Sequence, residues 1–143
     1  MSERAFRLTI AVVALATVGI AAYLLQAHYA GASVVCSTGG CETVAQSRYS
    51  EIFGVPIALI GLVGSVAILG SLAIRGALGR ATGLALTLSG LIFAAYLIAV
   101  QVLVIGAVCE WCVANDALIA VLALLALWRA RSADAAALRF ALR

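Results

Sequence analysis

The chain has 143 residues, of which 66% are hydrophobic and only 10% are charged. A soluble domain of this length needs a far more polar surface, so the composition excludes a soluble globular protein and indicates a single-domain membrane protein. The net charge of +3 gives no indication of a nucleic-acid partner.

Four apolar segments are long enough, or nearly so, to cross a membrane, which takes about 20 mainly apolar residues. They cover about residues 6–27, 54–74, 82–108 and 112–128, and the last is the shortest. The sequence therefore predicts an all-α membrane protein whose one domain, residues 1–131, is a bundle of four transmembrane helices. Residues 132–143 should form a basic cytoplasmic tail.

The arginines predict how the chain is oriented. All nine basic residues are arginines, and with four crossings eight of them fall on one side of the membrane. These eight are Arg4, Arg7, Arg75, Arg80, Arg129, Arg131, Arg139 and Arg143. Because cytoplasmic loops carry the excess of basic residues, we expect both termini in the cytoplasm. The loop 28–53 and the segment 109–112 then face outward, to the periplasm if the chain lies in a bacterial inner (cell) membrane.

The predicted outer loop has two parts. Gly31 to Gly40 (GASVVCSTGG) is rich in small residues and should be irregular and flexible. From 42 to 53 (ETVAQSRYSEIF), residues recur at helical spacing, which predicts a short helix lying along the membrane surface. His28, the only histidine, precedes this loop, where a purely interfacial place is favoured over a role in proton transfer.

The four cysteines form two pairs on the predicted outer side. Cys109 and Cys112 make a CxxC where the last helix should begin, and unpaired N–H groups and the helix dipole stabilise a thiolate there. Cys36 and Cys41 lie in the flexible loop, which suits a relay through mixed disulfides. Two alternatives stay open: disulfides that only staple the fold, and a four-cysteine zinc site. We expect no metal, because an oxidising exterior argues against zinc.

A larger ordered set of residues surrounds these cysteines. The run from Cys36 to Pro56 (CSTGGCETVAQSRYSEIFGVP), followed downstream by Cys-Glu-Trp-Cys, resembles the vitamin K epoxide reductase family in its stand-alone bacterial form. The shared features are the loop cysteine pair, the Cys-Glu-x-Val…Ser-x-Tyr run, the Phe-Gly-x-Pro entry to the second helix, and the CxxC that opens the last one. The loop cysteines are closer in sequence here than in familiar members.

The resemblance implies a membrane thiol:quinone oxidoreductase that supports disulfide-bond formation. In that scheme Cys112 contacts the quinone (ubiquinone or menaquinone), Cys109 exchanges with Cys41, and Cys36 meets the substrate protein. The electron donor would be a thioredoxin-fold periplasmic oxidase acting in trans, since the chain carries no fused thioredoxin-like domain. The residues expected at the quinone pocket are Ser47, Phe53, Trp111 and Asp116.

Two of these pocket residues have a second interpretation. Asp116 stands where the vertebrate enzymes have a pocket tyrosine, and it either donates a proton to the reduced quinone or only bonds a neighbouring helix. Glu110 and Trp111 would tune the thiolates and shield the quinone edge, and Trp111 is alternatively a plain anchor at the membrane interface. Two rival functions also remain: a quinone (vitamin K) epoxide reductase, and a non-catalytic membrane scaffold with structural disulfides or zinc.

Overall fold

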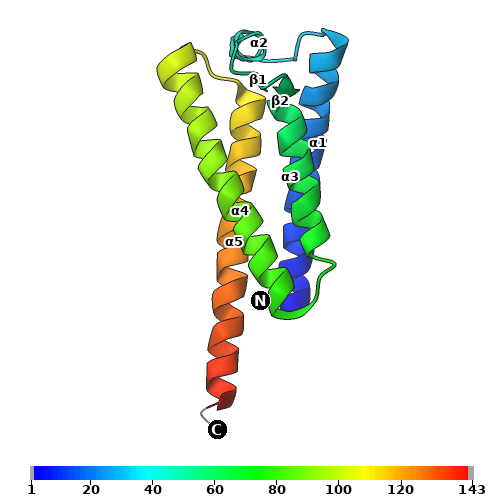
Figure 1. The fold of residues 1–143 in the computed structure, drawn as a ribbon, viewed down its shortest axis with the longest axis vertical. Helices are drawn as coiled ribbons and strands as arrows, with labels where there is room; N and C mark the ends of the chain where they lie inside the picture. Colours follow the sequence, from blue (N-terminus) through cyan, green and yellow to red (C-terminus); the bar gives the residue numbers. More distant parts are fainter. Residues whose placement is uncertain (1, 142–143) are drawn as a thin grey trace.

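The computed structural model describes residues 2–141, and nearly all of their regular structure is helical (Figure 1). The α-helices are α1 (Glu3–Ala30), α2 (Gly40–Ala45), α3 (Ile57–Ser71), α4 (Gly76–Ala99) and α5 (Glu110–Ala141). A π-helix, η1 (Val100–Ile105), continues α4. Strands β1 (Glu51–Ile52) and β2 (Val55–Pro56) pair antiparallel as a small hairpin.

Three of the helical segments are apolar and long enough to cross a membrane: Glu3–Ala30, Gly76–Ile105 and Glu110–Ala135. Large apolar side chains such as Ile92, Leu103 and Leu124 project from them into the surroundings, as they do on lipid-facing helices. These helices fit the predicted membrane protein. Helix α3 has 15 residues and spans about 22 Å, less than the roughly 30 Å of a bilayer core. The fourth crossing therefore stays a prediction.

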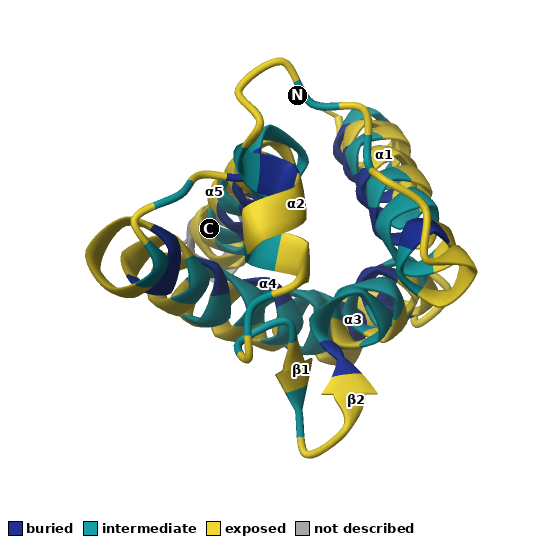
Figure 2. Cartoon of the chain, turned by 90° about the horizontal axis from the view of Figure 1, so that it is seen from above, coloured by how far each residue is buried: buried dark blue, intermediate teal, exposed yellow. Residues whose placement is uncertain are grey.

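The long helices and α3 form a ring. Helix α1 packs against α3 and α5, and α4 packs against the same two helices. Viewed along the bundle, α2 lies over the space that these helices surround, with the β1–β2 hairpin beside α3 (Figure 2). At the opposite end of the bundle α1 begins, the α3–α4 turn lies, and α5 continues beyond the other helices (Figure 1).

Polar contacts of two arginines stabilise the end opposite α2. Arg129 is almost fully buried and pairs with Glu3, with 3.0 Å between its Nε and Glu3 Oε1. Arg7 donates from Nη2 to the carbonyl of Leu72 at 2.6 Å. The contacts join α1 to α5 and α1 to the end of α3 at this end of the bundle. Which side of a membrane this end faces stays a prediction.

The last two long helices begin and end at residues other than the predicted ones. The helix predicted over 82–108 begins at Gly76 and ends with η1 at Ile105, where Gly106 adopts a left-handed conformation (φ 70°). The helix predicted over 112–128 begins at Glu110 and continues to Ala141, through most of the predicted tail. Alanine is the strongest helix former, and the alanine-rich sequence after residue 132 continues the helix for that reason. Residues 142 and 143 lie outside the described part.

The surface helix predicted over 42–53 needs correction. Helix α2 covers only Gly40–Ala45, and the chain turns back where Ser47 bonds the carbonyl of Val44 through both its N–H (3.2 Å) and its hydroxyl (2.7 Å). Phe53 (φ 53°) and Gly54 (φ 79°) then form the turn of the hairpin. Left-handed conformations at both central residues are typical of the tight hairpin turn, which no helix accommodates.

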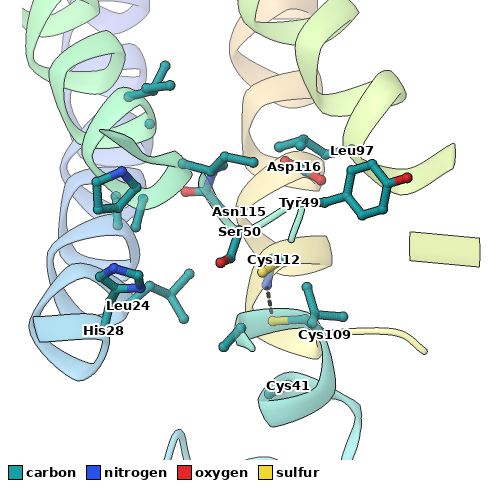
Figure 3. Close-up of a pocket in the computed structure, with 18 of the residues that line it drawn as sticks. Leu24, His28, Cys41, Tyr49, Ser50, Leu97, Cys109, Cys112, Asn115 and Asp116 are labelled. Carbon is teal, nitrogen blue, oxygen red and sulfur yellow. Dashed lines mark hydrogen bonds between the residues drawn. The ribbon is translucent and has the colours of Figure 1, made fainter. Parts of the chain in front are cut away.

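The interior of the ring changes character along its length. Towards the end where α1 begins, Ile10, Ala14, Ile68, Ile119 and Leu122 are buried against one another as a packed core. Towards α2, helix α4 slants away from α1 and α3 (Figure 1), and the helices enclose a cavity (Figure 3).

Candidate functional site

The cavity beneath α2 has a volume of about 640 Å³, within the range of roughly 300–1,000 Å³ common for small-molecule sites. Its walls come from α1, α3, α4 and α5, and Tyr49 and Ser50 contribute to its outer side. Three of the four cysteines line it: Cys41, Cys109 and Cys112 (Figure 3). The cavity thus brings together cysteines from the loop and from the CxxC.

The CxxC forms the start of α5. The N–H of Val113 donates to the carbonyl of Cys109 at 3.0 Å, which is the first hydrogen bond of the helix. The N–H of Cys112 donates to Cys109 Sγ at 3.3 Å, so the sulfur caps the helix end (Figure 3). Both cysteines are free thiols, Cys109 buried and Cys112 half-buried. The helix start therefore places a sulfur where exposed N–H groups stabilise negative charge.

The pKa of Cys109 is lowered from the usual thiol value to about 7. The hydrogen bond from the Cys112 side chain is the main cause, and the backbone N–H groups of Cys112 and Trp111 add to it. Burial of Cys109 opposes the shift but is outweighed. Near neutral pH, Cys109 is thus both a reactive thiolate and a good leaving group in disulfide exchange.

We expect the alkylation of Cys109 by iodoacetamide to rise with pH and reach half its maximal rate near pH 7. The thiolate is the reacting species, so the rate falls below this pH as the thiol forms and levels off above it. In Cys112→Ala the main stabilising hydrogen bond is lost, and the midpoint should move upward. Peptide mass spectrometry gives the rate at Cys109 alone, and Cys112→Ser, which retains a hydroxyl donor, is the matched control. An unchanged midpoint in Cys112→Ala would contradict this account.

Gln101, in η1, positions the CxxC through a hydrogen bond to Cys109. The sequence analysis did not identify Gln101 as a site residue. Its side chain is buried in η1, and its Oε1 accepts a hydrogen bond of 2.8 Å from the N–H of Cys109. Its backbone carbonyl accepts from Ala107 at 3.2 Å. The signal was present in the sequence, because Gln101 is a lone amide inside an otherwise apolar segment, and polar groups at that depth are usually paired or functional.

The loop pair is joined in the structure. Cys36 and Cys41 form a disulfide with their Cα atoms 6.0 Å apart. Gly40, next to Cys41, lies directly against the backbone of Val108, which precedes Cys109. Cys41, in α2, is fully buried and lines the cavity, whereas Cys36 is half-buried and is not among the lining residues. The loop pair therefore has one cysteine that lines the same cavity as the CxxC.

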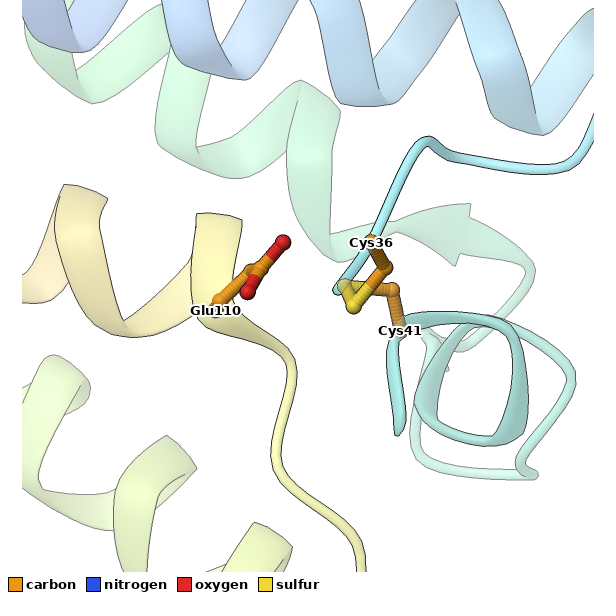
Figure 4. Close-up of side chains that lie close together, drawn as sticks. All are labelled: Cys36, Cys41 and Glu110. Atoms are coloured by element: carbon orange, nitrogen blue, oxygen red, sulfur yellow. A yellow bond between two sulfur atoms is a disulfide. The ribbon is translucent and has the colours of Figure 1, made fainter. Parts of the chain in front are cut away.

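A carboxylate lies beside the loop disulfide. The ligand atoms of Cys36, Cys41 and Glu110 lie within 4.8 Å of one another (Figure 4). The two sulfurs are bonded to each other, so in this state they offer a metal no thiolate, which is the form that binds zinc. A four-cysteine zinc site would require Cys109 and Cys112 in this group. Among residues 2–141, neither of them belongs to it.

Polar groups without partners occur in the cavity wall. Asp116, predicted as a pocket residue, lines the cavity one helical turn after Cys112 (Figure 3). Among the described residues, its Oδ2, Asn115 Oδ1 and Ser65 Oγ are buried without a hydrogen-bond partner. Buried polar atoms are nearly always paired, so these three are available to the polar groups of a ligand. The sequence analysis missed Asn115, although it adjoins Asp116 at the same depth.

The other predicted pocket residues do not line the cavity. Ser47 uses its hydroxyl to end α2. Phe53 is fully exposed at the tip of the hairpin. Trp111 points to the loop, where its Nε1 donates to the carbonyl of Val35 at 2.7 Å and its ring lies 5.2 Å from that of Tyr23. The structure thus brings Asp116 alone of the four to the cavity.

His28 lies on the α1 side of the same cavity. Its Nε2 is 3.1 Å from Glu51 Oε1 on β1, and Glu51 is partly exposed. Figure 3 shows His28 across the cavity from Cys109 and Cys112. The pair connects the cavity wall to the outside of the bundle, and a role of His28 in proton transfer stays a prediction.

Comparison with known proteins identifies the family. Curated protein sequences gave no significant match. The sequence model of the vitamin K epoxide reductase family matches residues 8–127, a segment that contains the whole cavity wall and all four cysteines. Membership implies a membrane oxidoreductase with quinone-linked redox chemistry. The match covers most of the 143 residues, and the chain belongs to the vitamin K epoxide reductase family.

Proposed function

We propose that this chain oxidises a thioredoxin-fold dithiol protein outside the membrane and passes the two electrons to a membrane quinone. The electrons would travel through Cys36 and Cys41 and then through Cys109 and Cys112. One observation carries the proposal: Cys41, Cys109 and Cys112 line a single cavity between apolar helices. A dithiol relay and a lipid-soluble acceptor meet in such a place.

The transfer from the loop to the CxxC proceeds by two exchanges. After the partner protein has reduced the loop pair, the Cys41 thiolate attacks Cys109 of the Cys109–Cys112 disulfide, and Cys112 leaves as a thiolate. Cys36 then attacks Cys41, which closes the loop disulfide and releases Cys109. Because the pKa of Cys109 is about 7, Cys109 leaves readily in this second exchange.

The arrangement of bonded and free cysteines supports this sequence of steps. Cys36 and Cys41 are joined, whereas Cys109 and Cys112 are free. This is the combination that follows transfer to the CxxC and precedes the loss of the two electrons to the acceptor.

The lining fits a quinone. When bound, a quinone supplies an acceptor for two electrons and two protons. The apolar walls would exclude water, and the unpartnered oxygens of Asn115 and Asp116 lie next to Cys112, where the polar end of a ligand needs partners. Cys112 is the half-buried member of the CxxC and faces this space. These residues would bind the ring and hold a proton near its oxygen.

The proposal is tested by quinol formation with the purified protein in detergent, a reduced thioredoxin-fold oxidase and either ubiquinone or menaquinone. The wild-type protein should form quinol, and Cys112→Ala should not, although both remain helical by circular dichroism. If neither forms quinol, the scaffold becomes the better interpretation, and bound zinc is then measured. Reduction of a quinone epoxide without reduction of the quinone would instead favour the epoxide reductase.

A further inference from the structure

The two residues between the cysteines of the CxxC both bond to the loop that carries Cys36. Glu110 accepts two hydrogen bonds from Ser37, one of 2.8 Å from the N–H to Oε1 and one of 2.6 Å from the hydroxyl to Oε2. Trp111 donates from Nε1 to the carbonyl of Val35 at 2.7 Å. Neither side chain lines the cavity. Their contacts therefore hold the loop, and the proposed quinone site is formed by other residues.

These contacts hold the loop from both sides. Glu110 and Trp111 form hydrogen bonds to it from α5. On α1, Tyr23 accepts a hydrogen bond from the N–H of Val35 at 3.2 Å. The Tyr23 and Trp111 rings lie against each other, with centroids 5.2 Å apart. The loop thus lies between α1 and α5, although residues 32–36 form no helix or strand.

Among these residues, Glu110 makes the most specific contact, because both of its carboxylate oxygens accept hydrogen bonds from one residue, Ser37. Figure 4 shows its carboxylate beside the Cys36–Cys41 disulfide, and its two oxygens match the two donors of Ser37. Ser37 is adjacent to Cys36 in the chain, and Glu110 is adjacent to Cys109. A bond between these two residues therefore fixes one cysteine pair relative to the other.

We propose that Glu110 is a positioning residue that docks the disulfide loop on the CxxC through Ser37, so that Cys41 faces Cys109 for the exchange between the two pairs. The inference rests on the proposed relay and adds the element that aligns its two halves. A flexible loop alone would present Cys41 to Cys109 only part of the time. The docked loop raises that fraction, and the exchange rate rises with it.

The contact is exposed, so its effect should be moderate. Hydrogen bonds to a charged group contribute more than neutral ones, and solvent reduces that contribution. We expect Glu110→Ala to slow the formation of the Cys41–Cys109 disulfide about tenfold, and Ser37→Ala, which retains the hydrogen bond from the backbone N–H, to slow it less. This rate is measured in a Cys36→Ala/Cys112→Ala background, where Cys41 and Cys109 are the only cysteines, by oxidation and non-reducing mass spectrometry.

Three comparisons separate docking from a general loss of structure. The Ser37→Ala/Glu110→Ala double variant should be no slower than Glu110→Ala, because Glu110→Ala already removes both hydrogen bonds. Glu110→Gln, which retains one acceptor oxygen, should be intermediate. Thr43→Ala, which removes an exposed hydroxyl nearby that makes no hydrogen bond among the described residues, should match the wild type. Multiplicative effects in the double variant would overturn the proposal.

A direct measurement of the docked loop does not depend on the relay. Hydrogen–deuterium exchange at the Ser37 amide should be slow in the wild-type protein and fast in Glu110→Ala, because that N–H donates to the carboxylate. Equal exchange in the two proteins would overturn the docking. Slow wild-type exchange together with no quinol formation would instead overturn the relay and leave the docking in place.

Discussion

Replacing Gly40 by alanine should slow the exchange between the loop cysteines and the CxxC by about 100-fold or more. Gly40 begins α2, immediately before Cys41, and lies against the backbone of Val108. A Cβ there would overlap the Val108 carbonyl oxygen and lie 2.9 Å from the Val108 nitrogen. Backbone atoms next to the CxxC cannot move aside as a side-chain tip can, so α2 must move and take Cys41 with it.

The measurement is the rate of Cys41–Cys109 disulfide formation in the Cys36→Ala/Cys112→Ala background, together with quinol formation in the otherwise unchanged chain. Both should fall in Gly40→Ala. Gly19→Ala is the matched control, because Gly19 lies in α1 with no atom within 4 Å of an added Cβ. A normal exchange rate in Gly40→Ala would show that the loop pair reaches the CxxC without the observed contact between α2 and Val108.

The sequence predicted the parts of this molecule that depend on composition and local order. Long apolar runs have no alternative to helix in a membrane, so three spans were predicted, although α5 continues well beyond its predicted end. The CxxC at the start of α5 was predicted because the apolar run breaks at Cys109 and resumes after Cys112. The family resemblance was also confirmed, because its motifs are short and ordered.

The segment between Glu42 and Phe53 was predicted wrongly because two local patterns competed. Val44, Ser47 and Ile52 fit helical spacing, but Ser47 also has a hydroxyl that bonds the carbonyl of Val44 and ends the helix. The Phe53-Gly54 pair then forms a hairpin turn that places Phe53 in a left-handed conformation. Few side chains favour that conformation, so a phenylalanine gave no signal of it.

The functional roles that the sequence left undetermined depend on contacts between distant residues. Glu110 and Ser37 are 73 positions apart, and Trp111 and Val35 are 76 apart. No spacing rule pairs such residues. Placing Trp111 at the quinone was reasonable from its position in the CxxC, but its N–H needed a partner, and the loop carbonyl supplies one. The cavity lining formed by Tyr49 and Ser50 likewise depends on how the hairpin folds back.

Replacing Asp116 by leucine should lower quinol formation by about 100-fold or more and leave the exchange between Cys41 and Cys109 unchanged. Asp116 lines the cavity one helical turn from Cys112, and its Oδ2 has no partner among the described residues. A group that supplies a proton to the acceptor typically contributes about 10²–10⁴-fold to the rate. Leucine fills similar space but can neither hold a proton nor form a hydrogen bond.

The stability of the same variant separates the two interpretations of Asp116. If Asp116 only bonds a neighbouring helix, leucine removes that bond, and the melting temperature in detergent should fall. If Asp116 serves the reaction, leucine removes a buried polar group that lacks a partner, and stability should be unchanged or higher.

Asp116→Asn, which can form a hydrogen bond but has no acidic proton, should recover binding of the quinone more than turnover. Val121→Ala, at an exposed position of α5, is the control. A destabilised Asp116→Leu with normal quinol formation would assign Asp116 to helix packing and leave the proton donor to be sought at His28.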